Sequence, residues 1–207
     1  MTQRKDLHER VLTAKNKQEL AAAYNEWAKR YDTDLVDEMG YVAPINAAGL
    51  FNRHMAASAT VLDAGCGTGL VGECLHQMGY RNIVGLDYSK KMLKEAESKQ
   101  VYSALLQGDL NDLHDINDNQ YNGVISVGTF TSGHVGPGAL NELIRVTRPA
   151  GIICFTVRDS AWQEESYDAA ITSMVKDGKW ELLEEKDFDY IRSEGSLCRT
   201  CVFQVAS

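Results

Sequence analysis

Three glycines, Gly65, Gly67 and Gly69, alternate with other residues in the stretch "VLDAGCGTGL" (residues 61–70), and an acid, Asp63, precedes the first of them. A glycine-rich turn that follows a strand usually binds phosphate through its backbone N–H groups. A carboxylate at the entrance of such a turn repels a phosphate but attracts a cationic group. The pattern therefore predicts a site for a small molecule that carries a positive charge near Asp63.

A nicotinamide cofactor is the natural competitor for this turn. The segment "GTGLVG" (residues 67–72) has the formal pattern G-x-G-x-x-G, and Asp87 follows Gly67 by 20 residues, the spacing of a ribose-binding acid. A dinucleotide lays a pyrophosphate across the turn, whereas S-adenosylmethionine presents an ammonium and a sulfonium. Asp63 favours S-adenosylmethionine because its carboxylate can accept from the ammonium, directly or through a water. An NAD(P)-dependent oxidoreductase stays open as the alternative.

Two further acids stand at the ends of the next apolar segments. Asp87 ends "VGLD" and can accept hydrogen bonds from both ribose hydroxyls of an adenosine. Asp109 follows "LLQG" and can accept from the adenine amino group, while the backbone N–H of Leu110 donates to a ring nitrogen. The ring of Tyr88 can lie against the adenine. These positions predict an adenosine site beside the glycine turn.

Short apolar segments alternate with amphipathic helical patterns through the rest of the chain. Strands are expected at residues 59–65, 82–87, 102–109, 121–128 and 152–157, and helices at residues 69–79, 89–99, 137–147 and around 167–175. Residues 186–192 and 197–205 read as a hairpin around the turn "SEGS". The order predicts an α/β, Rossmann-like fold: a seven-stranded, mostly parallel sheet with helices on both faces and a C-terminal antiparallel hairpin.

Residues 1–57 carry no strand signal and are expected to form a helical N-terminal extension of the same domain, with residues 58–207 as the core. Within residues 18–32, apolar side chains recur at helical spacing. They are Leu20, Tyr24, Trp27, Ala28 and Tyr31. A second helix is expected to begin near Pro44. Because the aromatic stripe would be exposed unless it docks, we expect residues 1–40 to act as a lid.

The segment after the fourth strand, "GTFTSGHVGPG" (residues 128–138), is expected to face the reacting group. His134 is the candidate general base, since an ordinary histidine pKa lies near 6.5. Its other interpretation is a loop histidine that forms local hydrogen bonds. Further candidates for the walls and mouth of this space are Thr129, Phe130, Thr131, Arg158 and Trp162.

Four segments, "VLDAGCGTG", "GLDYS", "GDL" and "RPAGIICFTV", resemble in order and spacing the class I S-adenosylmethionine-dependent methyltransferases, over about residues 58–205. Two more, "YNEWAKRYDTDLVDEMGYVAP" and "SVGTFTSGHVGPGAL", resemble the Williams–Beuren-region methyltransferase-like proteins. The resemblance implies methyl transfer from S-adenosyl-L-methionine, with S-adenosyl-L-homocysteine as product. It also implies that Tyr24 and Tyr31 contact the methionine end of the cofactor. One departure is Ala150, which stands where the family usually has glycine.

The predicted cofactor-binding residues come from the turn, the strand ends and the N-terminal helix. They are Asp63, Gly65, Cys66, Gly67, Asp87, Tyr88, Asp109, Leu110, Val127, Tyr31 and Tyr24. The family signatures for methylation of adenine, glutamine or cytosine do not follow the fourth strand, and a net charge of −8 argues against nucleic acid. A small-molecule acceptor is favoured, with a protein acceptor second. A non-catalytic module that binds the same cofactor is a third interpretation.

The remaining composition predicts a cytoplasmic protein that is not bound to a membrane. The N-terminal "MTQRKDLHER" lacks the apolar core of a secretory signal, and no run approaches the roughly 20 apolar residues of a membrane span. Nothing in the sequence separates the cytosol from the nucleus. Five cysteines favour free thiols. Cys198 and Cys201, three apart on an expected strand, should face opposite sides, so no metal site is predicted.

Overall fold

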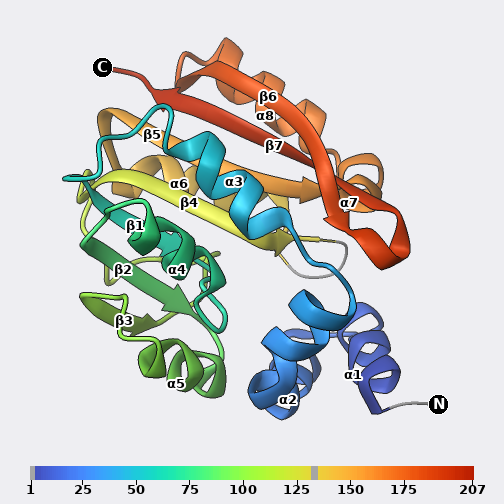
Figure 1. Cartoon of the computed structure of the whole chain (residues 1–207). Coiled ribbons are helices and arrows are strands. Elements are labelled where there is room, and N and C mark those ends of the chain that lie inside the picture. The colour runs from blue at the N-terminus through green and yellow to red at the C-terminus, as the bar shows by residue number, and fades with distance from the viewer. Residues whose placement is uncertain (1–2, 132–134) are drawn as a thin grey trace.

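The computed structural model describes residues 3–131 and 135–207, and within them seven strands form one mixed sheet (Figure 1). The strands are β1 (Thr60–Ala64), β2 (Asn82–Asp87), β3 (Ala104–Gln107), β4 (Tyr121–Phe130), β5 (Thr147–Arg158), β6 (Trp180–Ile191) and β7 (Ser196–Val205). Their order is β3-β2-β1-β4-β5-β7-β6. The predicted seven-stranded sheet is confirmed.

Strand direction and order create a crevice at the centre of the sheet. β1 pairs in parallel with both β2 and β4, while β7 is antiparallel to its neighbours β5 and β6. Along the chain, β2 and β3 are therefore added on one side of β1, and β4 then pairs with the other side of β1. In such sheets, ligands bind beyond the carboxyl ends of the strands where the order reverses. Here that position lies between the ends of β1 and β4.

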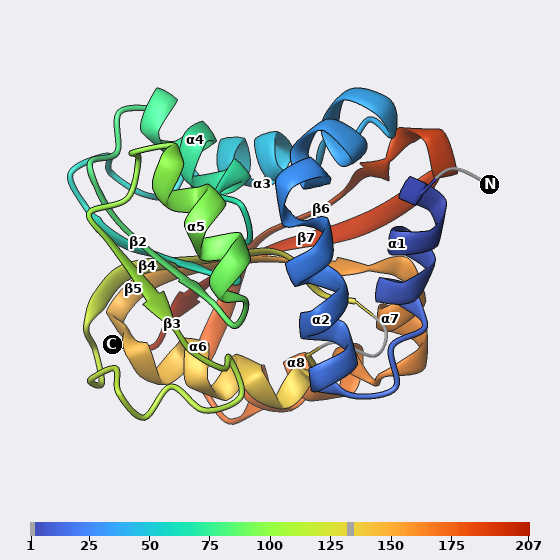
Figure 2. The same ribbon diagram turned by 90° about the horizontal axis from the view of Figure 1, so that it is seen from below.

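Helices cover both faces of the sheet, as predicted (Figures 1 and 2). One face packs against α3 (Ala43–Phe51), α4 (Leu70–Gln77) and α5 (Lys90–Ser98), and the other against α6 (Leu140–Val146), α7 (Asp159–Glu164) and α8 (Tyr167–Lys176). Successive strand residues point to opposite faces. Val61 and Leu62 in β1 are accordingly both fully buried, each in a different hydrophobic cluster. Burial on both sides explains the continuous apolar run of this strand.

The N-terminal helices α1 (Gln3–Leu12) and α2 (Lys17–Trp27) lie across the carboxyl end of the sheet (Figure 2). The α-helix predicted for residues 18–32 ends at Trp27, and the chain stays helical through the 3₁₀-helix η1 (Ala28–Arg30) and the π-helix η2 (Thr33–Glu38). The indole of Trp27 is buried and donates to Asp34 Oδ2 at 2.8 Å. Arg30 also donates to this buried carboxylate, at 3.1 Å. The predicted aromatic stripe is therefore docked in this structure.

Local signals placed the beginnings of α3 and α5 correctly. Ser89 caps α5 by accepting from the backbone N–H of Met92, and Pro44 lies in the first turn of α3. Cys198 and Cys201 belong to different hydrophobic clusters on the two faces of the sheet, as strand alternation predicts. Within the described ranges, no helix combines the length and apolarity needed to cross a lipid bilayer.

Candidate functional site

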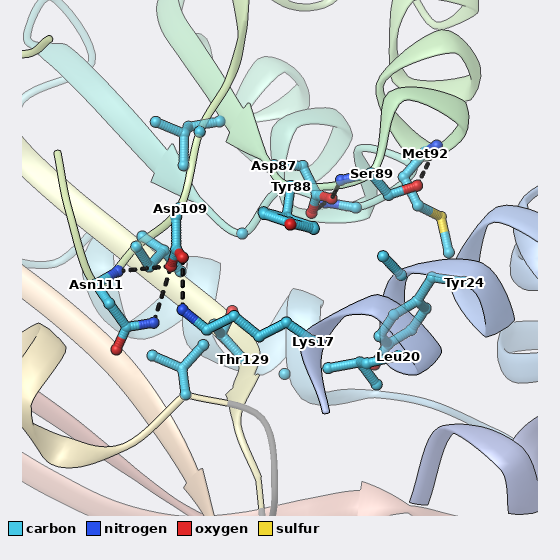
Figure 3. Close-up of a pocket in the computed structure, with 18 of the residues that line it drawn as sticks. Lys17, Leu20, Tyr24, Asp87, Tyr88, Ser89, Met92, Asp109, Asn111 and Thr129 are labelled. Carbon is cyan, nitrogen blue, oxygen red and sulfur yellow. Dashed lines mark hydrogen bonds and ion pairs between the residues drawn. The ribbon is translucent and has the colours of Figure 1, made fainter. Parts of the chain in front are cut away.

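A cavity of about 140 Å³ lies beyond the carboxyl ends of β1, β2 and β4, beneath helix α2 (Figure 3). Nine of the eleven predicted cofactor-binding residues line it. They are Gly65, Gly67, Asp87, Tyr88, Asp109, Leu110, Val127, Tyr24 and Tyr31. The other two, Asp63 and Cys66, do not line this cavity. Residues far apart in the sequence therefore converge at the position where the strand order reverses.

The glycine turn has left-handed backbone that other residues would strain. The φ angles of Gly65, Gly67 and Gly69 are +80°, +53° and +95°. A Cβ atom on Gly65 would lie 2.3 Å from Thr129 Oγ1, so a side chain there would collide with the end of β4. A Cβ atom on Gly67 would meet nothing within 4 Å. There is therefore no space for a side chain at Gly65, whereas the space beside Gly67 is open.

The backbone N–H groups of this turn are used inside the protein. Gly65 and Cys66 both donate to the Leu86 carbonyl, at 2.8 and 2.9 Å. Gly67 donates to Asp87 Oδ2 at 2.9 Å, and Gly69 donates to the Cys66 carbonyl at 2.8 Å. Phosphate binding by a glycine turn requires N–H groups directed at the ligand. These four groups are instead directed at protein oxygens, so the turn is a poor phosphate cradle.

Asp87 joins the glycine turn to the beginning of α5. Its Oδ2 accepts from Gly67 and its Oδ1 accepts from the backbone N–H of Ser89 at 2.8 Å. Burial raises the pKa of this carboxyl, while the backbone hydrogen bonds oppose that rise. Each carboxylate oxygen can accept more than one hydrogen bond. Asp87 therefore lines the cavity in a fixed orientation with acceptor capacity left for a ligand.

Asp63 is fully buried beneath the turn rather than on the cavity surface. Its Oδ2 accepts from the hydroxyl of Tyr102 at 2.6 Å. Its Oδ1 has no hydrogen-bond partner among the residues that the structure describes. Burial raises the pKa of Asp63 to about 7, although the Tyr102 hydrogen bond lowers it; the nearby charge of Asp87 adds to the rise. A buried carboxylate with an unused oxygen favours a cation in its vicinity.

Tyr102 positions Asp63 and was missed by the sequence reasoning. A Cβ atom on Gly72 would lie 2.3 Å from the Tyr102 hydroxyl, so only glycine at position 72 lets the first turn of α4 pack against this tyrosine.

The side chain of Cys66 is also directed away from the cavity, because a Cβ atom on Gly85 in β2 would lie 3.0 Å from its sulfur. Burial raises the pKa of this thiol well above its usual value. Asp63, Cys66 and Tyr102 are brought together only by tertiary packing, which no local sequence pattern predicts.

Asp109 lines the cavity but is already engaged by protein groups (Figure 3). Lys17 reaches from α2 and its Nζ lies 2.5 Å from Asp109 Oδ2. The backbone and side chain of Asn111 donate to Oδ1 at 2.9 and 2.8 Å. Partial burial raises the pKa of this carboxyl, but the hydrogen bonds from Lys17 and Asn111 outweigh it and leave the pKa below its usual value. Lys17 was not predicted to belong to the site.

Three further contacts join the N-terminal segment to the wall of the cavity. The Ser89 hydroxyl donates to Asn25 Oδ1 at 2.8 Å. Asp32 accepts from the Thr68 hydroxyl at 2.5 Å and lies 2.7 Å from Lys99 Nζ. The segment that covers the cavity is therefore held by polar contacts to the glycine turn and to α5.

Of the six remaining predicted residues, three line a cavity, two line neither of the two cavities, and one is not described. Thr129 lines the first cavity, whereas Thr131 and Arg158 line a second, smaller one. Phe130 is fully buried in the core, where its ring packs against Phe155 and Tyr167. Trp162 lies under the guanidinium of Arg199 and lines neither cavity. His134 lies outside the described residues.

Comparison with known proteins adds independent findings. Residues 62–155 match the family described as "Methyltransferase domain". The human methyltransferase-like protein 27 is 31% identical over 180 residues, which are 84% of this chain and 73% of that protein. The malonyl-[acyl-carrier protein] O-methyltransferase of Pectobacterium atrosepticum is 34% identical over 152 residues, 73% of this chain and 58% of that protein. A TehB-like S-adenosylmethionine-dependent methyltransferase from Corynebacterium glutamicum superposes with a TM-score of 0.66 at 21% identity, over 89% of this chain and 98% of that one.

Proposed function

Because the chain belongs to the class I S-adenosylmethionine-dependent methyltransferases, we propose that it transfers a methyl group from S-adenosylmethionine to a small-molecule acceptor. The observation that carries the cofactor assignment is the glycine turn. Its amides at Gly65, Gly67 and Gly69 donate to protein oxygens, and an acid with an unpartnered oxygen lies beneath it. This combination suits a ligand with an ammonium and no phosphate, and it disfavours the pyrophosphate of a nicotinamide cofactor.

The residues at the adenosine end fit the ribose and the adenine. Asp87 is oriented by Gly67 and Ser89 and would accept from the ribose hydroxyls. Tyr88 would lie against the adenine, with the backbone N–H of Leu110 as a donor to the ring. Asp109 would accept from the adenine amino group, either with the acceptor capacity left after its contacts to Lys17 and Asn111 or after Lys17 moves away.

At the methionine end, Tyr24 and Tyr31 line the cavity and Val127 forms part of its apolar wall. Asp63 lies beneath the turn and does not reach the ligand directly. It would interact with the ammonium through a bridging water or by electrostatic attraction over a longer distance. Cys66 would act by shaping the turn, because its side chain is directed toward β2 and its backbone N–H and carbonyl are bonded to Leu86 and Gly69. Asp63 and Cys66 therefore support the ligand from below.

When bound, S-adenosylmethionine supplies an electrophilic methyl group on a sulfonium. The protein's share is to hold the donor and acceptor in line and to keep water out. Helix α2 contacts the walls of the cavity through Lys17 and Asn25, and the segment after it does so through Asp32. This N-terminal cover is suited to exclude water. His134 remains our candidate for removing a proton from an acceptor that carries one.

The choice of a small acceptor depends on the charge and the motifs of this chain. The net charge of −8 disfavours nucleic acid. Relatives named malonyl-[acyl-carrier protein] O-methyltransferase act on a small acyl group attached to a protein, and this chain spans about three-fifths of that relative's length. A protein acceptor and a non-catalytic binding module are the competing proposals.

The test is incubation with methyl-labelled S-adenosylmethionine and a cell extract separated into metabolite and protein fractions. We expect label to enter the metabolite fraction and expect Asp87→Ala to reduce this transfer strongly when S-adenosylmethionine is below saturation. Label confined to the protein fraction would replace the small acceptor by a protein. No label in either fraction, with S-adenosylhomocysteine still bound, would favour the non-catalytic module.

A further inference from the structure

A second cavity of about 30 Å³ adjoins the first. Tyr24 and Tyr31 line both spaces, and their ring centroids lie 6.1 Å apart. Helix α1 forms part of the wall of the second cavity through His8, Val11 and Leu12. The two cavities are thus neighbours separated by tyrosine rings, with the second on the side of the N-terminus.

Two further tyrosines place the second cavity beside the end of β4. The rings of Tyr41 and Tyr190 meet edge to face with centroids 5.1 Å apart. A Cβ atom on Gly128, where φ is +74°, would lie 2.4 Å from the Tyr41 hydroxyl and 3.3 Å from the Tyr190 hydroxyl. Gly128 itself lines the first cavity. The hydroxyls therefore converge at the border between the two spaces, beside the glycine that gives them room.

Arg158, the last residue of β5, supplies a charge to the second cavity. Its side chain is only 17% exposed, and its Cζ lies 5.4 Å from the centre of the Tyr190 ring. Its one hydrogen bond to a described residue goes to Glu194 Oε2 at 2.8 Å. A guanidinium has five N–H donors. Most of its donor capacity is therefore left for another partner.

The polar groups around the second cavity are mainly hydrogen-bond donors. Among the described residues, no carboxylate lines it, although the whole chain carries a net charge of −8. The guanidinium of Arg158 and the hydroxyl of Thr131 can donate to an anion at this position. The hydroxyls of Tyr41 and Tyr190 hydrogen-bond to each other, so one of their two protons is left for an anion. Glu194 lies outside the lining and holds Arg158 from the β6–β7 turn, while His8 Nδ1 lies 3.5 Å from its other oxygen.

We propose that the second cavity is the acceptor site, and that the acceptor is a small molecule with a carboxylate that Arg158 binds. This inference rests on the proposed function, since it assigns the first cavity to the cofactor. The carboxylate would anchor one end of the acceptor at Arg158, and the rest would extend past the tyrosine hydroxyls towards Gly128. A space of 30 Å³ holds about one or two waters. A larger acceptor therefore needs part of the wall, such as α1, to move.

The alternative is that Arg158 and Glu194 form an ion pair whose only role is to hold the hairpin turn. The two accounts differ in what small carboxylates do to the folded protein. We would saturate the protein with S-adenosylhomocysteine, confirm that it is bound, and titrate malonate, succinate and benzoate to about 10 mM, a range that covers millimolar affinities. Malonamide, succinamide and benzamide are the matched neutral controls. Binding is read from NMR shifts of backbone and arginine side-chain signals.

We expect at least one carboxylate to bind and its amide not to. Arg158→Met keeps the stem against Tyr190 and removes the charge, so we expect affinity to fall at least about tenfold, the typical loss for a hydrogen bond to a charged group. Arg192→Met, on the same turn and 67% exposed, is the matched control and should bind as the wild type does. Glu194→Gln removes the competing anion and should tighten binding.

The proposal is overturned if no carboxylate binds, if the amides bind equally well, or if Arg158→Met binds as the wild type does. If Arg158→Met does not fold, Glu194→Gln decides: tighter binding supports the proposal, and unchanged or weaker binding overturns it. A protein that does not bind S-adenosylhomocysteine at the first step contradicts the proposed function instead. The two failures are therefore distinguishable.

Discussion

The buried carboxylate of Asp63 should make cofactor affinity depend on pH. Burial raises its pKa to about 7 in the protein without ligand. An ammonium near the glycine turn binds the ionised form of this acid, so affinity should increase as the pH rises towards that pKa. With a pKa of about 7, roughly 3% of the carboxyl is ionised at pH 5.5 and about half at pH 7.0. The expected gain in affinity for S-adenosylhomocysteine is therefore about 15-fold.

The same pKa shift has a consequence for folding. The folded-state pKa lies above the ordinary value of 3.8, so the folded protein binds the proton more tightly than the unfolded chain does. Stability attributable to this group is greatest below pH 4 and is lost as the pH rises to about 7, by up to about 4 kcal/mol. Asp63→Asn keeps an acceptor for Tyr102 and cannot ionise. The unliganded variant should therefore be more stable than the wild type at pH 8 and similar to it at pH 4.

Calorimetry of S-adenosylhomocysteine binding between pH 5.5 and 7.0, in buffers with different ionisation enthalpies, measures both the affinity and the protons released. At pH 7.0 we expect Asp63 to release about half a proton on binding. The pKa of Asp87 is also raised by burial and contributes with the same sign, so the comparison with Asp63→Asn isolates Asp63. A variant with the wild-type pH dependence, or a wild-type affinity independent of pH, would refute the assignment of Asp63.

Three further predictions concern the N-terminal segment, a backbone turn and the candidate base. Backbone amides of residues 17–40 should gain protection from hydrogen exchange when S-adenosylhomocysteine binds; unchanged protection would make this segment a permanent layer of the fold. Ala150 has a φ of +59°, so Ala150→Gly should raise the free energy of unfolding by about 1 kcal/mol, and a decrease in urea titrations would contradict this. Once an acceptor is known, His134→Ala should reduce turnover roughly 10²–10⁴-fold with little change in cofactor affinity, and wild-type turnover would remove it from the mechanism.

The sequence predicted the sheet well because its inner strands are buried on both faces and end at clear turn signals. It placed the beginning of β6 too late, at residue 186, whereas the strand begins at Trp180. The segment from residue 180 to residue 186 is rich in exposed acids such as Glu181 and Glu185. This edge strand is held by backbone pairing with β7, and such pairing needs no apolar side chains. The apolar pattern that reveals an inner strand is therefore missing.

The site was predictable where strand ends supply its residues, and less so where distant elements meet. Asp87 and Asp109 follow strands, and topology alone brings them to one edge of the sheet. Lys17 resembles any solvated lysine in the sequence, yet it lies 2.5 Å from an acid 92 residues away. The depth of Asp63 was also not predictable, because it depends on how Tyr102 packs over Gly72. Tertiary packing, and not local pattern, decides these contacts.

The central claim is that the cavity at the glycine turn binds S-adenosylmethionine and not a nicotinamide cofactor. The most direct measurement is calorimetric titration of the wild type and Asp87→Ala with S-adenosylhomocysteine and with NADH, with circular dichroism to confirm folding. We predict that the wild type binds S-adenosylhomocysteine and not NADH. Asp87→Ala should lose at least about 1.5–3 kcal/mol of binding free energy, because the ribose hydroxyls lose a charged acceptor. Binding of NADH without binding of S-adenosylhomocysteine, or wild-type affinity in a folded Asp87→Ala, would contradict the account.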